Sequence, residues 1–226
     1  MQQAVPDPII DAFMSLLAEK RFDAITLPEI ATRANLSLGA LREGADGKFA
    51  ILGAFIRRVD RAVLDEVEPG DAGGDSHRDR LLDVLMRRFD RLSAYRRSIA
   101  HLLESCRRDP ALALAVNALS LPSARYMLAG AGIGSDGMRG IARAEGLALL
   151  MAKVSSVWVE DTDPDQSRTM SALDKALSRA EDWDQRLGRA ERMLCGVARR
   201  FSSRRSSHRP SHVRETPPAG AGDVPA

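Results

Sequence analysis

Apolar residues recur three and four positions apart along most of the 226-residue chain, as they do on the buried face of a helix. The first such run covers residues 8–20, and a longer one extends from Lys48 to about Val67. Between them lie two short runs, 27–33 and about 37–43, with a turn at Asn35 and Leu36. No segment alternates apolar and polar residues in the manner of a strand. The pattern therefore predicts an all-α protein.

Capping signals mark the expected helix starts. Thr26 and Glu29 have the spacing of a capping box, and Ser37 is placed to cap the second short helix. Asp-Pro pairs occur at residues 7–8, 109–110 and 163–164. Each pair is expected to put a carboxylate at the N-cap and a proline in the first helical turn. At the third pair, Gln166 adds a capping-box partner for Asp163.

A segment rich in glycine and aspartate, residues 68–76, divides the chain into two parts. We expect a head domain at 1–68 and a helical body at 75–202. The body helices are predicted at about 77–94, 96–107, 110–129, 136–160, 164–180 and 182–201. Residues 199–226 hold six arginines against Glu215 and Asp223 and are rich in serine and proline, so 203–226 is predicted to be a disordered basic tail.

The composition suits helices packed around an aliphatic core. Hydrophobic residues make up 44% of the chain and aromatic residues only 4%. The two cysteines, Cys106 and Cys195, lie far apart and match no ligand spacing, which is typical of reduced thiols. There is no secretory pattern at the start and no run of about 18 uninterrupted apolar residues. We therefore expect a cytoplasmic protein that does not span a membrane.

Patterns that would indicate catalysis or metal binding are missing from the sequence. His208 and His212 have a metal-like spacing, but they lie in the predicted tail without cysteine partners. Asp161, Asp163 and Asp165 alternate as in a calcium loop, yet the glycine and the terminal glutamate of that loop are absent. No nucleophile motif with serine, histidine and aspartate is present. We expect no enzyme, no metal and no cofactor.

Two short helices at a sharp turn form a helix-turn-helix unit, whose second helix can enter the major groove of DNA. The run from Ile25 to Leu41, followed by Lys48 and Leu52, resembles the head of the TetR repressor family. That family has Thr, then Ile-Ala, then Ala-Gly-x-Ser-x-Gly-x-Leu, and a lysine that opens the fourth helix. The resemblance implies a TetR-like fold and a homodimer that binds double-stranded operator DNA. It also implies a body that receives a small apolar ligand.

The same resemblance implies which residues meet DNA. The recognition surface consists of Ser37, Leu38, Gly39, Ala40 and Arg42, while Thr26 and Lys48 would hold phosphates. Leu38 and Ala40 can touch thymine methyl groups, and Arg42 can pair with guanine or phosphate. Arg42 and Ala45 stand where the family usually has tyrosine and phenylalanine. Residues 20–61 hold eight basic against five acidic side chains, a weak form of the basic face that DNA binding favours.

A second resemblance supports an alternative function. The run from Trp158 to Asp165, with Thr169-Met170 and Leu173-Asp174, looks like a stretch shared by many TetR-like proteins and by the ubiquinone-biosynthesis lipid-binding proteins, which keep a degenerate TetR fold. This resemblance implies a body that binds an isoprenoid lipid and a head that does not bind DNA. The structural interpretation is that Trp158 ends a helix against the core, while Asp163 and Thr169 organise the next helix start. The predicted helix 182–201 is amphipathic, and it would pack on the body or a second subunit, or lie on a membrane under the alternative. A third possibility is an interaction protein that has the fold and neither activity.

Overall fold

The computed structural model describes residues 4–67 and 76–181, and all structural statements concern these residues. The α-helices are α1 (Asp7–Glu19), α2 (Leu27–Arg33), α3 (Leu38–Gly44), α4 (Lys48–Leu64), α5 (His77–Leu92), α6 (Arg96–Arg108), α7 (Pro110–Gly130) and α8 (Gly137–Trp158). Two 3₁₀ turns, η1 (Phe22–Ala24) and η2 (Ser93–Tyr95), connect them, and residues 167–181 form a further helix. The described chain contains no strand, so the predicted all-α class is confirmed. The predicted helix 182–201 and the tail lie outside the described residues.

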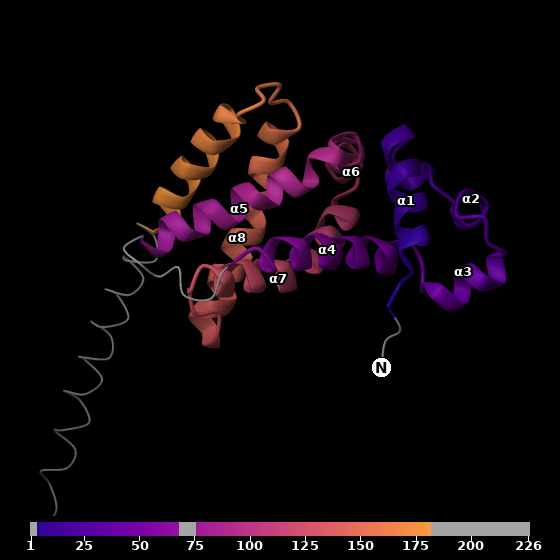
Figure 1. Ribbon diagram of the computed structural model, residues 1–226, viewed down its shortest axis with the longest axis horizontal. Coiled ribbons are helices and arrows are strands. Elements are labelled where there is room, and N and C mark those ends of the chain that lie inside the picture. Colours follow the sequence, from indigo (N-terminus) through magenta and orange to yellow (C-terminus); the bar gives the residue numbers. More distant parts are fainter. Residues whose placement is uncertain (1–3, 68–75, 182–226) are drawn as a thin grey trace, which may run out of the picture. The chain divides into compact units, whose positions relative to one another are not determined.

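The head is formed by α1, α2, α3 and the first half of α4, and α2 and α3 lie together on one side of the ribbon in Figure 1. Its core is aliphatic with a few phenylalanines, because one face of each helix carries the apolar residues. Phe13, Leu17, Ile30 and Ile51 are buried completely. The Phe13 and Phe22 rings meet edge to face with centroids 6.0 Å apart. The short α2 and α3 are held through this shared core.

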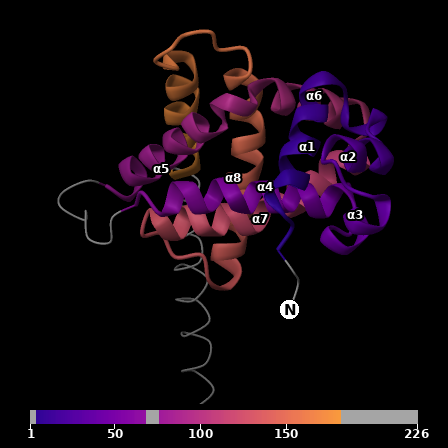
Figure 2. The same cartoon turned by 45° about the vertical axis from the view of Figure 1, so that its right-hand side comes forward.

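Helix α4 continues from the head into the body, where it packs against α5 and α7 (Figure 2). Phe89 of α5 and Trp158 of α8 are buried against each other, with ring centroids 5.4 Å apart. A buried polar cluster joins three helices: Asp60 of α4 is ion-paired with Arg88 of α5, and its Oδ1 accepts a hydrogen bond from Ser123 of α7 at 2.8 Å. Each member of the cluster is satisfied, as a buried polar group requires.

Helix α6 connects the body to the head because it lies against α1. Ser98 donates a hydrogen bond from Oγ to the carbonyl of Met14 at 2.8 Å. His101 Nδ1 lies 2.9 Å from the carbonyl oxygen of Leu17, and Ser105 Oγ accepts from the amide of Phe22 at 3.0 Å. These contacts cross the boundary that the sequence placed between head and body, so the two parts are in direct contact along α6.

Of the three predicted Asp-Pro caps, one forms as expected. Asp109 accepts hydrogen bonds from the amides of Ala111 and Leu112 at the start of α7. The cap predicted at Asp7 is wrong, because α1 begins at Asp7 itself and its carboxylate pairs with Arg58. The cap predicted at Asp163 is also wrong, because the next helix begins at residue 167.

Asp161 takes the capping role there instead, since its Oδ2 accepts from the amide and hydroxyl of Thr169 at 2.9 and 2.7 Å. Gln166 has a φ of 50°, which is incompatible with the predicted first helical turn. The structural interpretation of this segment is therefore half right. Trp158 does end α8 in the core, but Asp161 rather than Asp163 binds Thr169.

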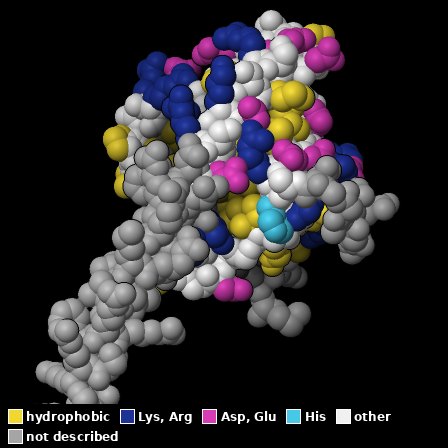
Figure 3. Space-filling view, turned by 90° about the vertical axis from the view of Figure 1, so that its left-hand side faces the viewer, with side chains coloured by type: hydrophobic (Ala, Val, Ile, Leu, Met, Phe, Trp, Pro, Cys, Tyr) yellow, Lys and Arg dark blue, Asp and Glu magenta, His cyan; other side chains and the backbone are white. Residues whose placement is uncertain are grey.

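On the face of the molecule seen in Figure 3, charged and apolar side chains are mixed.

One described helix, α7, is long and apolar enough to cross a bilayer by length and composition alone, although core helices often meet the same criterion. The expectation that the protein does not span a membrane rested on the absence of an uninterrupted apolar run. Helix α7 interrupts its apolar residues with small polar ones, including Asn117 and Ser120.

Candidate nucleic-acid interface

The turn between α2 and α3 has the geometry of a helix-turn-helix unit. Helix α2 begins with the predicted capping box: Thr26 Oγ1 accepts from the Glu29 amide, and Glu29 Oε2 accepts from the Thr26 amide at 2.9 Å. Asn35, with a φ of 55°, supplies the left-handed residue that ends α2, and the Leu36 amide donates to the Ala31 carbonyl at 2.9 Å. Ser37 Oγ then caps α3 by accepting from the Ala40 amide at 3.1 Å. The turn is built from local hydrogen bonds, and it places α3 at the surface.

The first turn of α3 projects outward. Leu41 is 2% exposed and anchors the helix in the head core, whereas Leu38 is 52% exposed. The other predicted recognition residues, Ser37, Gly39, Ala40 and Arg42, are exposed as well. The structure thus brings these five recognition residues onto one short exposed helix and its N-cap.

The cations of this region are neutralised by acids. Residues 4–47 contain four basic side chains, and every one of them is ion-paired: Lys20 with Glu29, Arg21 with Asp23, Arg33 with Glu19 and Arg42 with Asp46. The same segment contains seven acidic side chains. The basic face that the sequence suggested is therefore cancelled locally, and Arg42 meets a carboxylate one turn further along the chain.

Thr26 uses its hydroxyl within the capping box. Its Oγ1 accepts from the Glu29 amide and also lies 2.9 Å from Glu29 Oε2, to which it donates. Hydrogen bonds from Lys20 and then from Thr26 lower the pKa of Glu29 to about 2, so this carboxylate is ionised at neutral pH. A phosphate at Thr26 would have to compete with the adjacent Glu29 carboxylate.

Lys48 is half-buried, and its ammonium group holds the head together. Its Nζ donates to the carbonyl oxygens of Phe22 and Ile25, both at 2.9 Å, and lies 4.6 Å from the centroid of the Phe22 ring. Loss of hydration at this position lowers the pKa of Lys48. The sequence resemblance predicted a lysine on phosphate, and it gave no signal for these two carbonyls, which lie more than twenty positions away. Since an ammonium group has three protons, one remains for a phosphate.

No protein-family model matches the sequence, and no curated protein matches it. Solved structures do. The TetR transcriptional regulator from Nitrosomonas europaea superposes with a TM-score of 0.59 at 19% identity, covering 77% of this chain and 96% of that one. A TetR regulator from Rhodococcus sp. RHA1 superposes with a TM-score of 0.52 at 18% identity, covering 76% of this chain and 92% of that one. The fatty acid degradation regulator FadR from Bacillus halodurans superposes with a TM-score of 0.52 at 17% identity, covering 76% of this chain and 93% of that one.

The chain has the TetR-family fold. At these identities the likeness concerns the fold alone, and it confirms the fold that the run from Ile25 to Leu52 predicted. In the terms of this fold, α2 and α3 are the helix-turn-helix unit, α4 is the helix that carries it into the body, and α5 to α8 with helix 167–181 form the body. The residues that would contact DNA in this chain are proposals, which follow.

Proposed function

We propose that this protein is a one-component transcriptional regulator of the TetR type, and not an enzyme. The observation that carries the proposal is the helix-turn-helix unit in its TetR-fold context, with the first turn of α3 exposed above a buried Leu41. A short exposed helix of this kind fits the major groove, where base edges can be read. Such a regulator acts on chromosomal DNA, so we place it in the cytoplasm.

Each recognition residue has a specific role in this proposal. Leu38 and Ala40 contact thymine methyl groups, while Arg42 leaves Asp46 and pairs with guanine or phosphate. Ser37 and Gly39 allow the α3 backbone to approach the groove closely, because both are small. Lys48 keeps its two carbonyl partners and offers its third proton, together with the free amides at the start of α4, to a phosphate. Thr26 contacts phosphate only if its hydroxyl leaves Glu29.

The proposed DNA-binding form is a homodimer. Helix α8 presents a row of apolar residues to solvent, with Met138 83%, Ile141 45% and Leu149 61% exposed, and Met170 on the next helix is 47% exposed. An exposed apolar row of this length favours burial against a second copy. The two heads of the dimer would then meet half-sites about 34 Å apart, one turn of DNA, in a palindromic operator.

The proposed effector is a small apolar ligand received by the body, whose binding changes the spacing of the two heads. Its support is the aliphatic interior between α5, α7 and α8, where Leu85, Met127 and Leu147 are buried. The isoprenoid-binding alternative gains no support from the similar structures, which are transcriptional regulators. Asp161 and Trp158, which carried that resemblance, have structural partners in Thr169 and Phe89.

The decisive experiment is fluorescence anisotropy of the full chain with labelled DNA from upstream of its own gene, against random DNA of equal length. We expect sequence-selective binding, and we expect it to weaken at least tenfold in a Leu38→Ala, Arg42→Ala double variant, at about 1.4 kcal/mol per factor of ten. Both side chains are exposed, so the variant should keep its fold. Arg125→Ala, an exposed arginine on α7, is the matched control and should bind like the unmodified chain. Binding no better than to random DNA would refute the proposal.

A further inference from the structure

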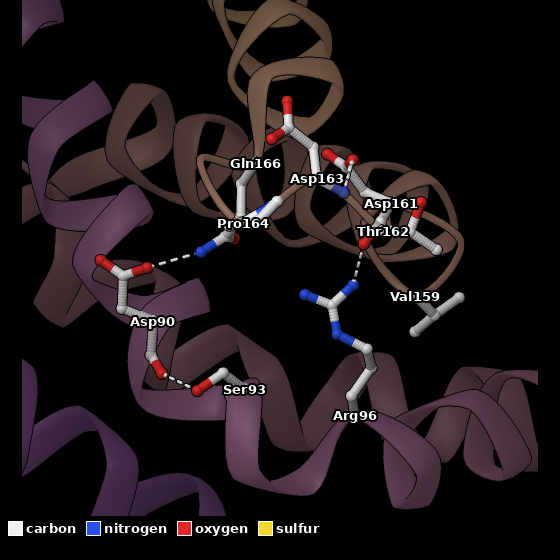
Figure 4. Close-up of a pocket in the computed structure, with 9 residues that line it drawn as sticks. All are labelled: Asp90, Ser93, Arg96, Val159, Asp161, Thr162, Asp163, Pro164 and Gln166. Atoms are coloured by element: carbon white, nitrogen blue, oxygen red, sulfur yellow. Dashed lines mark hydrogen bonds between the residues drawn. The ribbon is translucent and has the colours of Figure 1, made fainter.

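A polar cleft of about 570 Å³ lies at the surface of the body, and no residue of α2 or α3 lines it (Figure 4). One wall comes from the end of α5, from η2 and from the first residue of α6, and the other from the connection between α8 and helix 167–181. The polar residues that line it are Asp90, Ser93, Arg96, Asp161, Thr162, Asp163 and Gln166. Val159 and Pro164 add a small apolar surface. The cleft is large enough for a small organic molecule.

Arg96 is fixed in this cleft without a carboxylate partner among the described residues. Its Nη1 donates to the carbonyl oxygens of Trp158, at 2.5 Å, and of Asp161. Its guanidinium carbon lies 4.5 Å from the centroid of the Trp158 ring. Within the described chain its Nε and Nη2 make no hydrogen bond, and one of these nitrogens points into the cleft (Figure 4). Arg96 is therefore a preorganised cation with a free hydrogen-bonding edge.

The carboxylates around Arg96 are directed to other groups. Asp161 binds Thr169, and Asp163 binds the hydroxyl of Ser167; these hydrogen bonds lower the pKa of both acids, so both are ionised. Asp90 Oδ1 accepts from Gln166 Nε2 at 2.6 Å, and Oδ2 has no partner among the described residues. The cleft thus holds a fixed positive charge at Arg96 and the negative charge of Asp90 on its wall, whereas the Asp163 carboxylate is turned away from Arg96 (Figure 4).

Gln166 adds an independent sign of a missing partner. The residue is 8% exposed, and its Oε1 is buried without a hydrogen-bond donor in the structure. A buried acceptor left without a donor costs about 1–3 kcal/mol. The amide lies on the wall of the cleft, beside Asp90 (Figure 4). A ligand donor would remove the cost only if the amide turned toward the cleft, because this oxygen is buried.

We propose that this cleft binds a small zwitterion that carries a carboxylate and an ammonium group, as an α-amino acid does. The carboxylate accepts from the free edge of Arg96, a geometry that guanidinium groups favour. The ammonium group donates to the Asp90 carboxylate, beside the Gln166 amide. A simple anion would be repelled by the aspartates, and a simple cation by Arg96. The inference concerns a site remote from α3, and it does not depend on DNA binding.

Isothermal titration calorimetry on the full chain tests the ligand class. The probes are L-alanine, L-leucine, L-glutamate and L-lysine, with propionate and ethylamine as the two single-charge fragments of alanine. We expect saturable binding of at least one amino acid, and at least tenfold weaker binding of either fragment than of L-alanine or its tightest-binding relative. If none of the amino acids binds saturably, or if a fragment binds as well as they do, the proposal is wrong.

Variants of the cleft locate the site. Asp90→Asn removes the negative charge from an exposed residue and keeps an acceptor for Gln166, so the fold should persist. Arg96→Lys keeps the positive charge and removes the planar edge. We expect each variant to weaken amino-acid binding at least tenfold. Asp165→Asn, an exposed aspartate of the same connection that does not line the cleft, should bind normally. Unchanged binding in both cleft variants would show that any amino acid binds elsewhere and would overturn the proposal. Because no DNA is present, this result is separate from the outcome of the operator experiment.

Discussion

Arg42 is the single basic residue of α3, and its pairing with Asp46 limits what this helix could offer to DNA in the proposed interface. Both side chains are more than half exposed, so the pair is worth little to stability. Its effect on binding is larger, because a carboxylate beside the groove repels phosphate and occupies the guanidinium. Asp46 therefore lowers the affinity of the proposed interface without being needed for the fold.

The Asp46→Asn substitution should tighten operator binding by about three- to tenfold at low salt, because it frees Arg42 and removes one negative charge. It should also steepen the dependence of log Kd on log salt concentration by about one unit for each new phosphate contact. Anisotropy titrations over a salt series measure both quantities. Asp165→Asn, with the same charge change in the body, should have neither effect. An unchanged affinity in Asp46→Asn would mean that Arg42 does not approach DNA.

Glu29 gives the head a defined acid sensitivity. Its pKa is lowered from 4.5 to about 2 by its hydrogen bond with Lys20 and then by Thr26. The stability that comes with this shift is present above the unfolded-state pKa and is lost as the pH falls from about 4.5 to 2. As the pH falls over this interval, the melting temperature of the Glu29→Gln variant should decrease less than that of the unmodified chain. Circular dichroism melts between about pH 5 and pH 2 test this, and equal slopes for both proteins would contradict it.

At the scale of elements, local signals could be predicted and long-range contacts could not. The Thr26 box, the Ser37 cap and the Asp109 cap each involve groups within four residues, so the sequence contains all the information they need. The cap predicted at Asp163 failed because Asp163 accepts from the Asp165 amide in a turn that the positive φ of Gln166 ends, so the helix begins later and Asp161 binds the Thr169 amide.

The hydrogen bonds of Lys48 to two carbonyls, and those from α6 to the head, join residues far apart in the chain. The spacing of apolar residues along the sequence gives no signal for such contacts. The cleft was missed for the same reason, since its two walls come from residues 90–96 and 159–166, which lie more than sixty positions apart in the chain. The exposed recognition surface on α3, by contrast, was predicted from the helix-turn-helix pattern.

The contact of α6 with the head should be measurable as stability. Ser105→Ala removes the acceptor for the buried Phe22 amide, and we expect the free energy of unfolding to fall by about 1–3 kcal/mol. Ser120→Ala is the matched control, because the Ser120 hydroxyl bonds only the Val116 carbonyl within its own helix. Urea unfolding monitored by circular dichroism compares the two variants. An equal, small effect of both would mean that Ser105 contributes little to docking.

For the whole molecule, the distribution of exposed apolar residues is more informative than the net charge of +2. Acids accompany the cations of the head, whereas α8 exposes a row of apolar side chains. Solubility at low net charge requires that such a row be covered or kept small. Self-association along α8 satisfies this requirement and creates the paired heads that a palindromic operator needs.

Leu149→Glu places a charge in the middle of this row and should convert the proposed dimer to a monomer at micromolar concentration, because a carboxylate would be buried without a partner. Leu114→Glu is the control: Leu114 is also strongly exposed, but it lies on α7 outside the row. Size-exclusion chromatography with light scattering gives the mass of each variant. Should Leu149→Glu remain dimeric, the interface lies elsewhere.

The hydrogen bond between Phe22 and Ser105 has a practical consequence for following the molecule in solution. The Phe22 amide lies in the short η1 turn, outside the hydrogen-bonding ladder of any long helix, and its acceptor comes from α6. Its exchange with deuterium therefore requires that α6 move away from the head or that the head unfold. Deuterium uptake by a peptide containing Phe22 would therefore report the rate of this opening. Mass spectrometry could measure that uptake with any ligand or DNA present, without a label.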